Sequence, residues 1–123
     1  MENQHKKITG YRDLSQEEID LMNRIKAKGA ELLALQNELA KSIRDRQTFL
    51  IEVVTSWQAV LDGPAILSAD QAEEAKTNRD DAQEELDLIY ATEVARWASI
   101  GKTDIQTGVM ALVRAVGKST LSC

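Results

Sequence analysis

The chain has 123 residues, of which 4% are aromatic, and a net charge of −5 at pH 7. A chain of this size makes one small domain or an elongated helical unit that associates to bury its apolar faces, which argues against a deep catalytic pocket within one monomer. Residues 61–97 hold ten acidic and three basic residues, so this part would repel a polyanion such as DNA or RNA.

A first helix is predicted over residues 15–61, after an N-terminal arm of residues 1–14. Ser15 and Glu18 form the capping box of a helix start, because the hydroxyl can accept the amide of Glu18 while the carboxylate reaches back. Apolar residues then recur at helical spacing, which predicts one buried face. The polar run around Gln47 leaves two alternatives, a continuous helix or a kink.

A turn is predicted over residues 62–67, because Asp62-Gly63-Pro64 combines a residue that ends helices with one that cannot continue them. Residues 68–100 are predicted to form a second helix, antiparallel to the first, with a polar, alanine-rich beginning. We interpret the acids on this helix as a solvated face rather than a metal site. They are Asp80, Asp81, Glu84, Glu85 and Asp87.

A short C-terminal helix is predicted over residues 103–117, where Thr103 and Gln106 repeat the capping-box pattern after Gly101. This segment is densely apolar, and a helix of about 15 residues is marginal alone in water. Two long helices offer too little surface to cover three apolar stripes, so association between chains is expected. The predicted fold is all-α: a long antiparallel helical hairpin plus a short apolar helix, in one helical domain over residues 1–123 that forms a homo-oligomer.

The groups that catalysis commonly requires are scarce. His5 is the only histidine and Cys123 the only cysteine, so one chain cannot assemble a histidine-based triad, a disulfide or a zinc site of these residues. Phosphate-binding glycine loops are missing. No membrane span or signal-peptide pattern is found, which predicts a cytoplasmic protein. We therefore predict no enzyme activity, no catalytic residue, no metal and no cofactor.

An aromatic residue and several cations gather around the start of the first helix. Tyr11 is free to stack on a nucleobase, a contact worth about 1–3 kcal/mol, because Leu14 and Ile19 are better placed as the hydrophobic staple. Lys26, and with it Lys28 and Arg12, could contact phosphates. From the residues alone, a solvated basic surface remains the leading interpretation.

Two further points concern where a phosphate would bind. The predicted start of the last helix, at Lys102 and Thr103, presents free amides suited to a phosphate, although we rank it below Lys26. Lys26 lies 11 residues past Ser15, or about 16 Å along a helix. Tyr11 would reach it only through an arm folded back along its own helix. Otherwise the two residues meet across a subunit boundary.

Both ends of the chain resemble one protein family. Residues 11–29, YRDLSQEEIDLMNRIKAKG, resemble the opening of the phage anti-CBASS cyclic-nucleotide sponges, the second type described in that group. Residues 95–115, ARWASIGKTDIQTGVMALVRA, look like the closing segment of the same family. The stretch from about Arg44 to Glu85 looks longer than in short members. The extra length could project from the assembly or alter it.

The resemblance implies a compact helical hexamer that sequesters cyclic oligonucleotide messengers in the infected host without degrading them. It implies that Tyr11 stacks on a base and Lys26 contacts a phosphate, with cyclic dinucleotides such as cyclic GMP-AMP between protomers. A separate cyclic trinucleotide pocket is also implied, and its three-fold arrangement would suit Arg12 or Arg114. Two alternatives remain: an adaptor that binds another protein through its apolar faces, and a hydrolase with a metal on the acidic helix.

Overall fold

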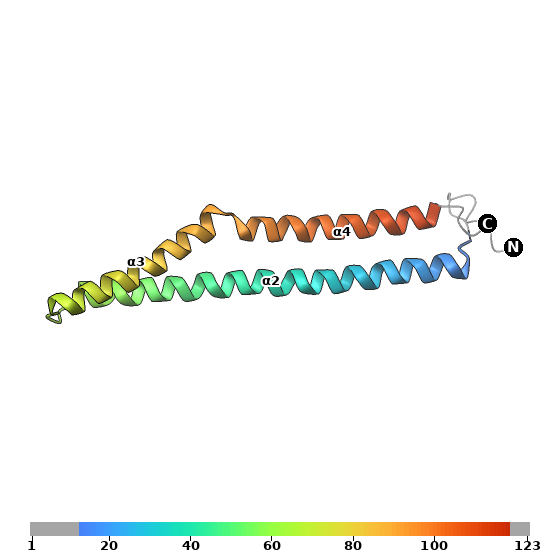
Figure 1. The fold of residues 1–123 in the computed structure, drawn as a ribbon. Helices are drawn as coiled ribbons and strands as arrows, with labels where there is room; N and C mark the ends of the chain where they lie inside the picture. The colour runs from blue at the N-terminus through green and yellow to red at the C-terminus, as the bar shows by residue number, and fades with distance from the viewer. Residues whose placement is uncertain (1–12, 119–123) are drawn as a thin grey trace. The chain divides into compact units, whose positions relative to one another are not determined.

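The computed structural model describes residues 13–118, which form three α-helices and no β-strand. They are α2 (Gln16–Asp62), α3 (Ala69–Ala91) and α4 (Val94–Lys118), as Figure 1 shows. The predicted all-α class, with a long helical hairpin and a C-terminal helix, is confirmed. The chain divides into two compact units: unit 1 is Met1–Asn37 with Ile100–Cys123, and unit 2 is Glu38–Ser99. None of the three described helices is long and apolar enough to cross a membrane.

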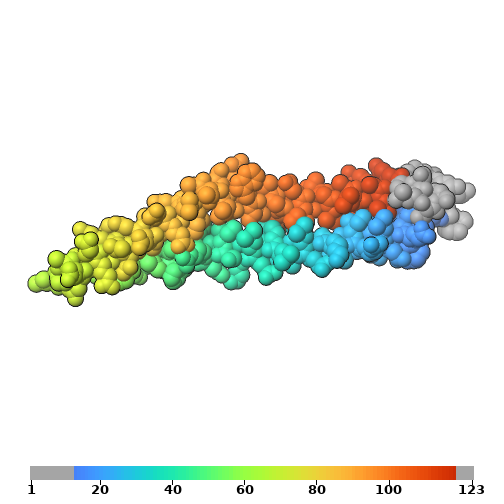
Figure 2. All heavy atoms as spheres, viewed as in Figure 1, coloured from blue at the N-terminus to red at the C-terminus, as the bar shows by residue number. Residues whose placement is uncertain are grey.

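Unit 2 is a helical hairpin in which the second half of α2 packs antiparallel on α3 (Figure 1). Its core is formed by Leu50, which is 2% exposed, together with Ala82 and Leu86. Partly buried aliphatic side chains surround this centre: Val53, Val54 and Ile89. The side chains of the two helices fill the space between them (Figure 2). The stability of unit 2 therefore rests on a small aliphatic core.

The turn between α2 and α3 has the chemistry that its sequence predicts. α2 ends at Asp62, directly before Gly63 and Pro64, and α3 begins after the N-cap residue Ser68. The amide of Gln71 donates to Ser68 Oγ at 3.1 Å, and the amide of Ser68 donates to Gln71 Oε1 at 2.9 Å. These two bonds satisfy amides that a helix start leaves free. α2 runs through Gln47 without interruption, as the first of the two alternatives predicted.

The boundary between the second and third helices differs from the prediction. The predicted second helix over residues 68–100 ends at Ala91, and the predicted C-terminal helix over residues 103–117 begins at Val94. Between them Glu93 adopts a φ of 53°, which is uncommon for a residue with a side chain. The hydroxyl of Thr92 donates to the carbonyls of Leu88 at 2.8 Å and Ile89 at 3.2 Å, and the amide of Glu93 donates to the carbonyl of Tyr90 rather than to that of Ile89. Residues 91–94 contain no glycine or proline, so the sequence carries no common signal of a helix end at this position.

A bidentate ion pair links the two helices of unit 2. Arg46 Nε donates to Glu85 Oε2 at 2.5 Å, and Arg46 Nη2 donates to Glu85 Oε1 at 2.7 Å. The guanidinium carbon of Arg46 also lies 5.2 Å from the centre of the Phe49 ring, within the range of a cation–π contact. The hydrogen bonds from Arg46 lower the pKa of Glu85 below its ordinary value of 4.5. The pair is therefore a pH-dependent contact between α2 and α3.

Removal of this carboxylate is expected to lower stability at neutral pH only. Because the pKa of Glu85 is lower in the folded than in the unfolded protein, its contribution is complete above about pH 4.5 and disappears as the pH falls through the folded value. Urea unfolding of Glu85→Gln should show a lower stability than the wild type at pH 7 and a converging stability at pH 3. Glu84→Gln, next to it in the chain, is the control. A difference for Glu85→Gln that stays the same at pH 3 would contradict the ion-pair origin.

Candidate functional site

The helix start that the sequence predicts at Ser15 is present in unit 1. The amide of Glu18 donates to Ser15 Oγ at 3.1 Å, and the amide of Ser15 donates to Glu18 Oε1 at 2.9 Å. Glu18 is only 2% exposed, so the capping box is built into the packed part of the unit. It fixes the beginning of α2 and hence the positions of the cations that follow. Tyr11 and Arg12 lie outside the described residues.

The first half of α2 packs tightly on the second half of α4. A Cβ atom added at Gly29 would lie 2.5 Å from Val109 Cγ2, far inside van der Waals contact. A Cβ atom added at Gly117 would lie 3.3 Å from Met22 Cε. Met22 on α2 contacts Gly117 on α4, and the later residue Gly29 contacts the earlier residue Val109. The two helices are therefore antiparallel in unit 1. Lys26 therefore lies level with α4 residues between positions 109 and 117.

An open groove runs along one side of this helix pair, with a volume of about 600 Å³. Its lining is mainly aliphatic, from Leu21, Ile25 and Leu32 of α2 and Ile105, Val109 and Leu112 of α4. Two basic residues, Arg24 and Lys28, and two acidic residues, Glu31 and Asp104, also line it. Lys28 Nζ lies 3.4 Å from Glu31 Oε2 in an exposed ion pair. The balanced charges and aliphatic lining suit apolar side chains better than an anion.

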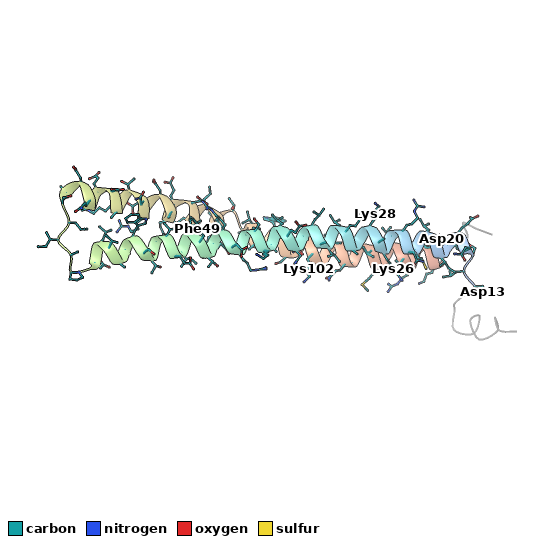
Figure 3. The ribbon with its side chains drawn as sticks, turned by 90° about the horizontal axis from the view of Figure 1, so that it is seen from below. Asp13, Asp20, Lys26, Lys28, Phe49 and Lys102 are labelled. Carbon is teal, nitrogen blue, oxygen red and sulfur yellow. The ribbon has the colours of Figure 1, made fainter. Side chains whose placement is uncertain are left out.

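Lys26 lies on the other side of unit 1. Residues two positions apart are separated by about 200° around a helix, so Lys26 points away from the groove that Lys28 lines. Figure 3 shows the two lysines on opposite edges of α2. They cannot serve the same phosphate within one chain. Lys26 is exposed, and no ion pair joins it to another described residue. Its ammonium is available to an anionic ligand.

Arg114 is on the same side of unit 1 as Lys26. On α4, Leu112 lines the groove and Arg114 follows two positions later, so its side chain also points away from the groove. The antiparallel register places Arg114 within about one helical turn of the level of Lys26. Arg114 is exposed, and no described residue forms an ion pair with it. The register and the groove lining thus place Lys26 and Arg114 on one side of unit 1 at neighbouring levels.

The structure corrects the predicted phosphate site at the start of the last helix. Lys102 and Thr103 lie inside α4, whose first residue is Val94, so their amides are not the free amides of a helix start. The capping-box pattern of Thr103 and Gln106 therefore does not mark a helix start. In the register of unit 1, Lys102 also lies about 15 Å along the helices from Lys26, because ten residues separate their levels. Within one chain, this separation keeps Lys102 and Thr103 apart from Lys26.

The two units differ strongly in charge. Unit 2 contains 13 acidic and six basic residues, whereas unit 1 contains seven acidic and nine basic residues. Attraction of an anion therefore favours unit 1. In unit 2, Asp80 and Glu85 pair with arginines. Among residues 13–118, no three histidine, cysteine, aspartate or glutamate side chains lie close enough together to hold a metal ion.

Sequence reasoning missed two features that shape the site. Gly29 and Gly117 permit the close approach of α2 and α4, and a glycine within a helical pattern is a recognised signal of such packing. Arg24 lines the groove beside Lys28, and their spacing of four residues could have predicted a shared face. Neither pattern says which helix forms the partner surface.

Comparisons with known proteins identify relatives along nearly the whole chain. A family model described as the Acb2/Tad1 hairpin domain matches residues 3–117. A curated protein, Anti-CBASS protein 2 of Pseudomonas phage JBD67, is 48% identical over 120 residues, which cover 96% of each chain. Because both chains are covered almost completely, the middle stretch from Arg44 to Glu85 is not an addition relative to this protein.

Proposed function

Because this chain belongs to the Acb2/Tad1 hairpin family, we propose that it is a phage protein that counters CBASS immunity by sequestering cyclic oligonucleotide messengers in the cytoplasm of the infected bacterium. The observation that carries this proposal is the match to an anti-CBASS protein across nearly the full length of both chains. Sequestration requires affinity and no chemistry. The protein lowers the concentration of free messenger, and the CBASS effector stays inactive.

The proposed ligands are cyclic dinucleotides such as cyclic GMP-AMP, with cyclic trinucleotides as a second class. A cyclic dinucleotide presents two bases and two negatively charged phosphates. Tyr11 would stack on a base and the ammonium of Lys26 would contact a phosphate. Lys26 is suited to this role because it is exposed and forms no ion pair with another described residue. Lys28 is less suited, because it lies on the groove side and forms an exposed ion pair with Glu31 at 3.4 Å.

We further propose that the functional form is a homo-oligomer, a hexamer in keeping with the resemblance. Unit 1 exposes half or more of several large apolar side chains, which association would cover. They include Leu32, Leu35 and Met110. Tyr11 and Lys26 would then come from different protomers, and the ligand would lie between them. This arrangement removes the need for an arm folded back over about 16 Å of helix.

Substitution of either proposed contact is expected to weaken ligand binding without changing the assembly. Removal of a charge-assisted hydrogen bond or a stacked ring costs about 1–3 kcal/mol, so Lys26→Ala and Tyr11→Ala should each lower affinity roughly tenfold to hundredfold. Isothermal titration with a panel of cyclic dinucleotides and trinucleotides measures this effect. Lys76→Ala, at an exposed lysine of unit 2, is the control for loss of one charge.

The proposal that the protein does not degrade its ligand is tested by analysing the cyclic nucleotide after incubation with the protein. After prolonged incubation and denaturation of the protein, the cyclic nucleotide should be recovered unchanged in stoichiometric amount. A linear product that increases with time would show a hydrolase instead. An oligomer that gives no saturable heat with any ligand of the panel would favour the adaptor alternative, in which the apolar faces bind another protein.

A further inference from the structure

We infer that Arg114 is a second cation of the messenger site, and that within one protomer it contacts the same bound anion as Lys26. This inference rests on the proposed function, because it concerns the ligand of that site. Arg114 is distinguished from the other described cations by its side of the helix pair, its level along the helices and its lack of a neutralising partner. Each of these properties follows from contacts within unit 1.

The level of Arg114 is fixed by the two tight contacts between the helices. Gly29 faces Val109, and Met22 reaches Gly117, so Lys26 lies between these two contact points. Arg114 lies between the same points on the other helix. Packed helix axes are about 8–10 Å apart, and less where a glycine permits close approach. Two long cationic side chains at this spacing can reach one phosphodiester-bearing ligand from its two sides.

The residues that line the groove show on which side of the helix pair Arg114 lies. Lys28 and Leu112 both line it, and Lys26 and Arg114 are each two positions from one of them. A step of about 200° takes both side chains to the face opposite the groove. Arg24 stays on the groove side with Lys28. The face opposite the groove therefore carries two cations from two helices at one level.

These two cations have no acidic neighbour one turn away. The residues three and four positions from Lys26 are Met22, Asn23, Gly29 and Ala30. Those around Arg114 are Met110, Ala111, Gly117 and Lys118. Two like charges that nothing on their own helices neutralises repel one another, and an anion between them relieves this repulsion. A planar guanidinium also binds a phosphate in a bidentate manner, which a second ammonium could not do.

The test compares charge-removing substitutions on the two sides of unit 1. Arg114→Gln should lower the affinity for a cyclic dinucleotide roughly tenfold to hundredfold, with helicity and oligomer mass unchanged, as Lys26→Gln should. Arg24→Gln, on the groove side, should stay within about twofold of the wild type. Arg114→Lys keeps the charge but loses the bidentate geometry, so its affinity should be intermediate.

The outcomes separate this inference from the function on which it rests. Wild-type affinity in Arg114→Gln, together with a loss in Lys26→Gln, would overturn the role of Arg114 and leave the proposed function standing. A loss of affinity in Arg114→Gln for a cyclic trinucleotide alone would also overturn it, since Arg114 would then serve the separate pocket. A wild-type protein that binds no cyclic nucleotide would instead remove the proposed function.

Discussion

Gly29→Ala is expected to destabilise the protein, whereas the same substitution at Gly101 is expected to stabilise it. The new Cβ atom at position 29 would lie 2.5 Å from Val109 Cγ2, and a β-branched side chain has little freedom to move away. Such overpacking costs about 1–3 kcal/mol. At Gly101 nothing lies within 4 Å of an added Cβ atom, so only the helical preference for alanine remains, worth about 1 kcal/mol. Urea unfolding at one protein concentration measures both free energies.

The cause of the Gly29 effect can be checked by a second substitution. Val109→Ala removes the two methyl groups that a residue at position 29 would meet. In the double variant, Gly29→Ala should therefore cost less than it does alone, and the two changes should not be additive. Additive effects would mean that position 29 acts through something other than Val109. Because Gly29 sets the spacing of α2 and α4, Gly29→Ala should also weaken messenger binding at Lys26.

Leu50→Ala is the second substitution expected to have a large effect. Leu50 is 2% exposed at the centre of unit 2, so its truncation removes buried methyl groups and leaves a cavity. Substitutions of this kind cost about 2–5 kcal/mol. The matched control is Leu88→Ala on α3, because that leucine is 62% exposed and surface changes usually stay within about 0.5 kcal/mol.

The same unfolding experiment decides whether this small core holds the hairpin together. A loss for Leu50→Ala no greater than that for Leu88→Ala would show that the cluster of Leu50, Ala82 and Leu86 contributes little. The stability of unit 2 would then rest on polar contacts such as the pair of Arg46 and Glu85. Messenger binding by Leu50→Ala, measured under conditions where it remains folded, should change little because Lys26 and Arg114 belong to unit 1.

Local sequence signals were sufficient wherever a helix end depends on a few neighbouring residues. The capping box of Ser15 and Glu18 and the turn at Gly63-Pro64 were both predicted, because they satisfy or remove backbone hydrogen bonds within four residues of themselves. The position of Lys26 on the first helix was predicted for the same reason. Its proposed role as a phosphate contact comes from the family resemblance.

The same kind of signal failed at Thr103 and Gln106. Their capping-box pattern lies in the interior of α4, where the backbone amides are already bonded to the preceding turn. The actual break is at Thr92 and Glu93, although glutamate has no preference for a positive φ. Glu93 is exposed, and its amide donates to the carbonyl of Tyr90 at 3.2 Å. No pattern in the neighbouring residues could have shown this.

The sequence by itself determined that this protein is helical, where α2 begins and ends, and which family it resembles, because these properties follow from composition, short-range hydrogen bonds and matching order at both ends of the chain. Only the tertiary structure decided which cations share a surface. Helix geometry alone separates Lys26 from Lys28 on α2. Only the packing of α4 on α2 brings Arg114, which is distant from Lys26 in sequence, to nearly the same level on the adjacent helix. The physical reason is that the packing of Gly29 against Val109 fixes the register and rotation of two helices that local sequence cannot relate to each other.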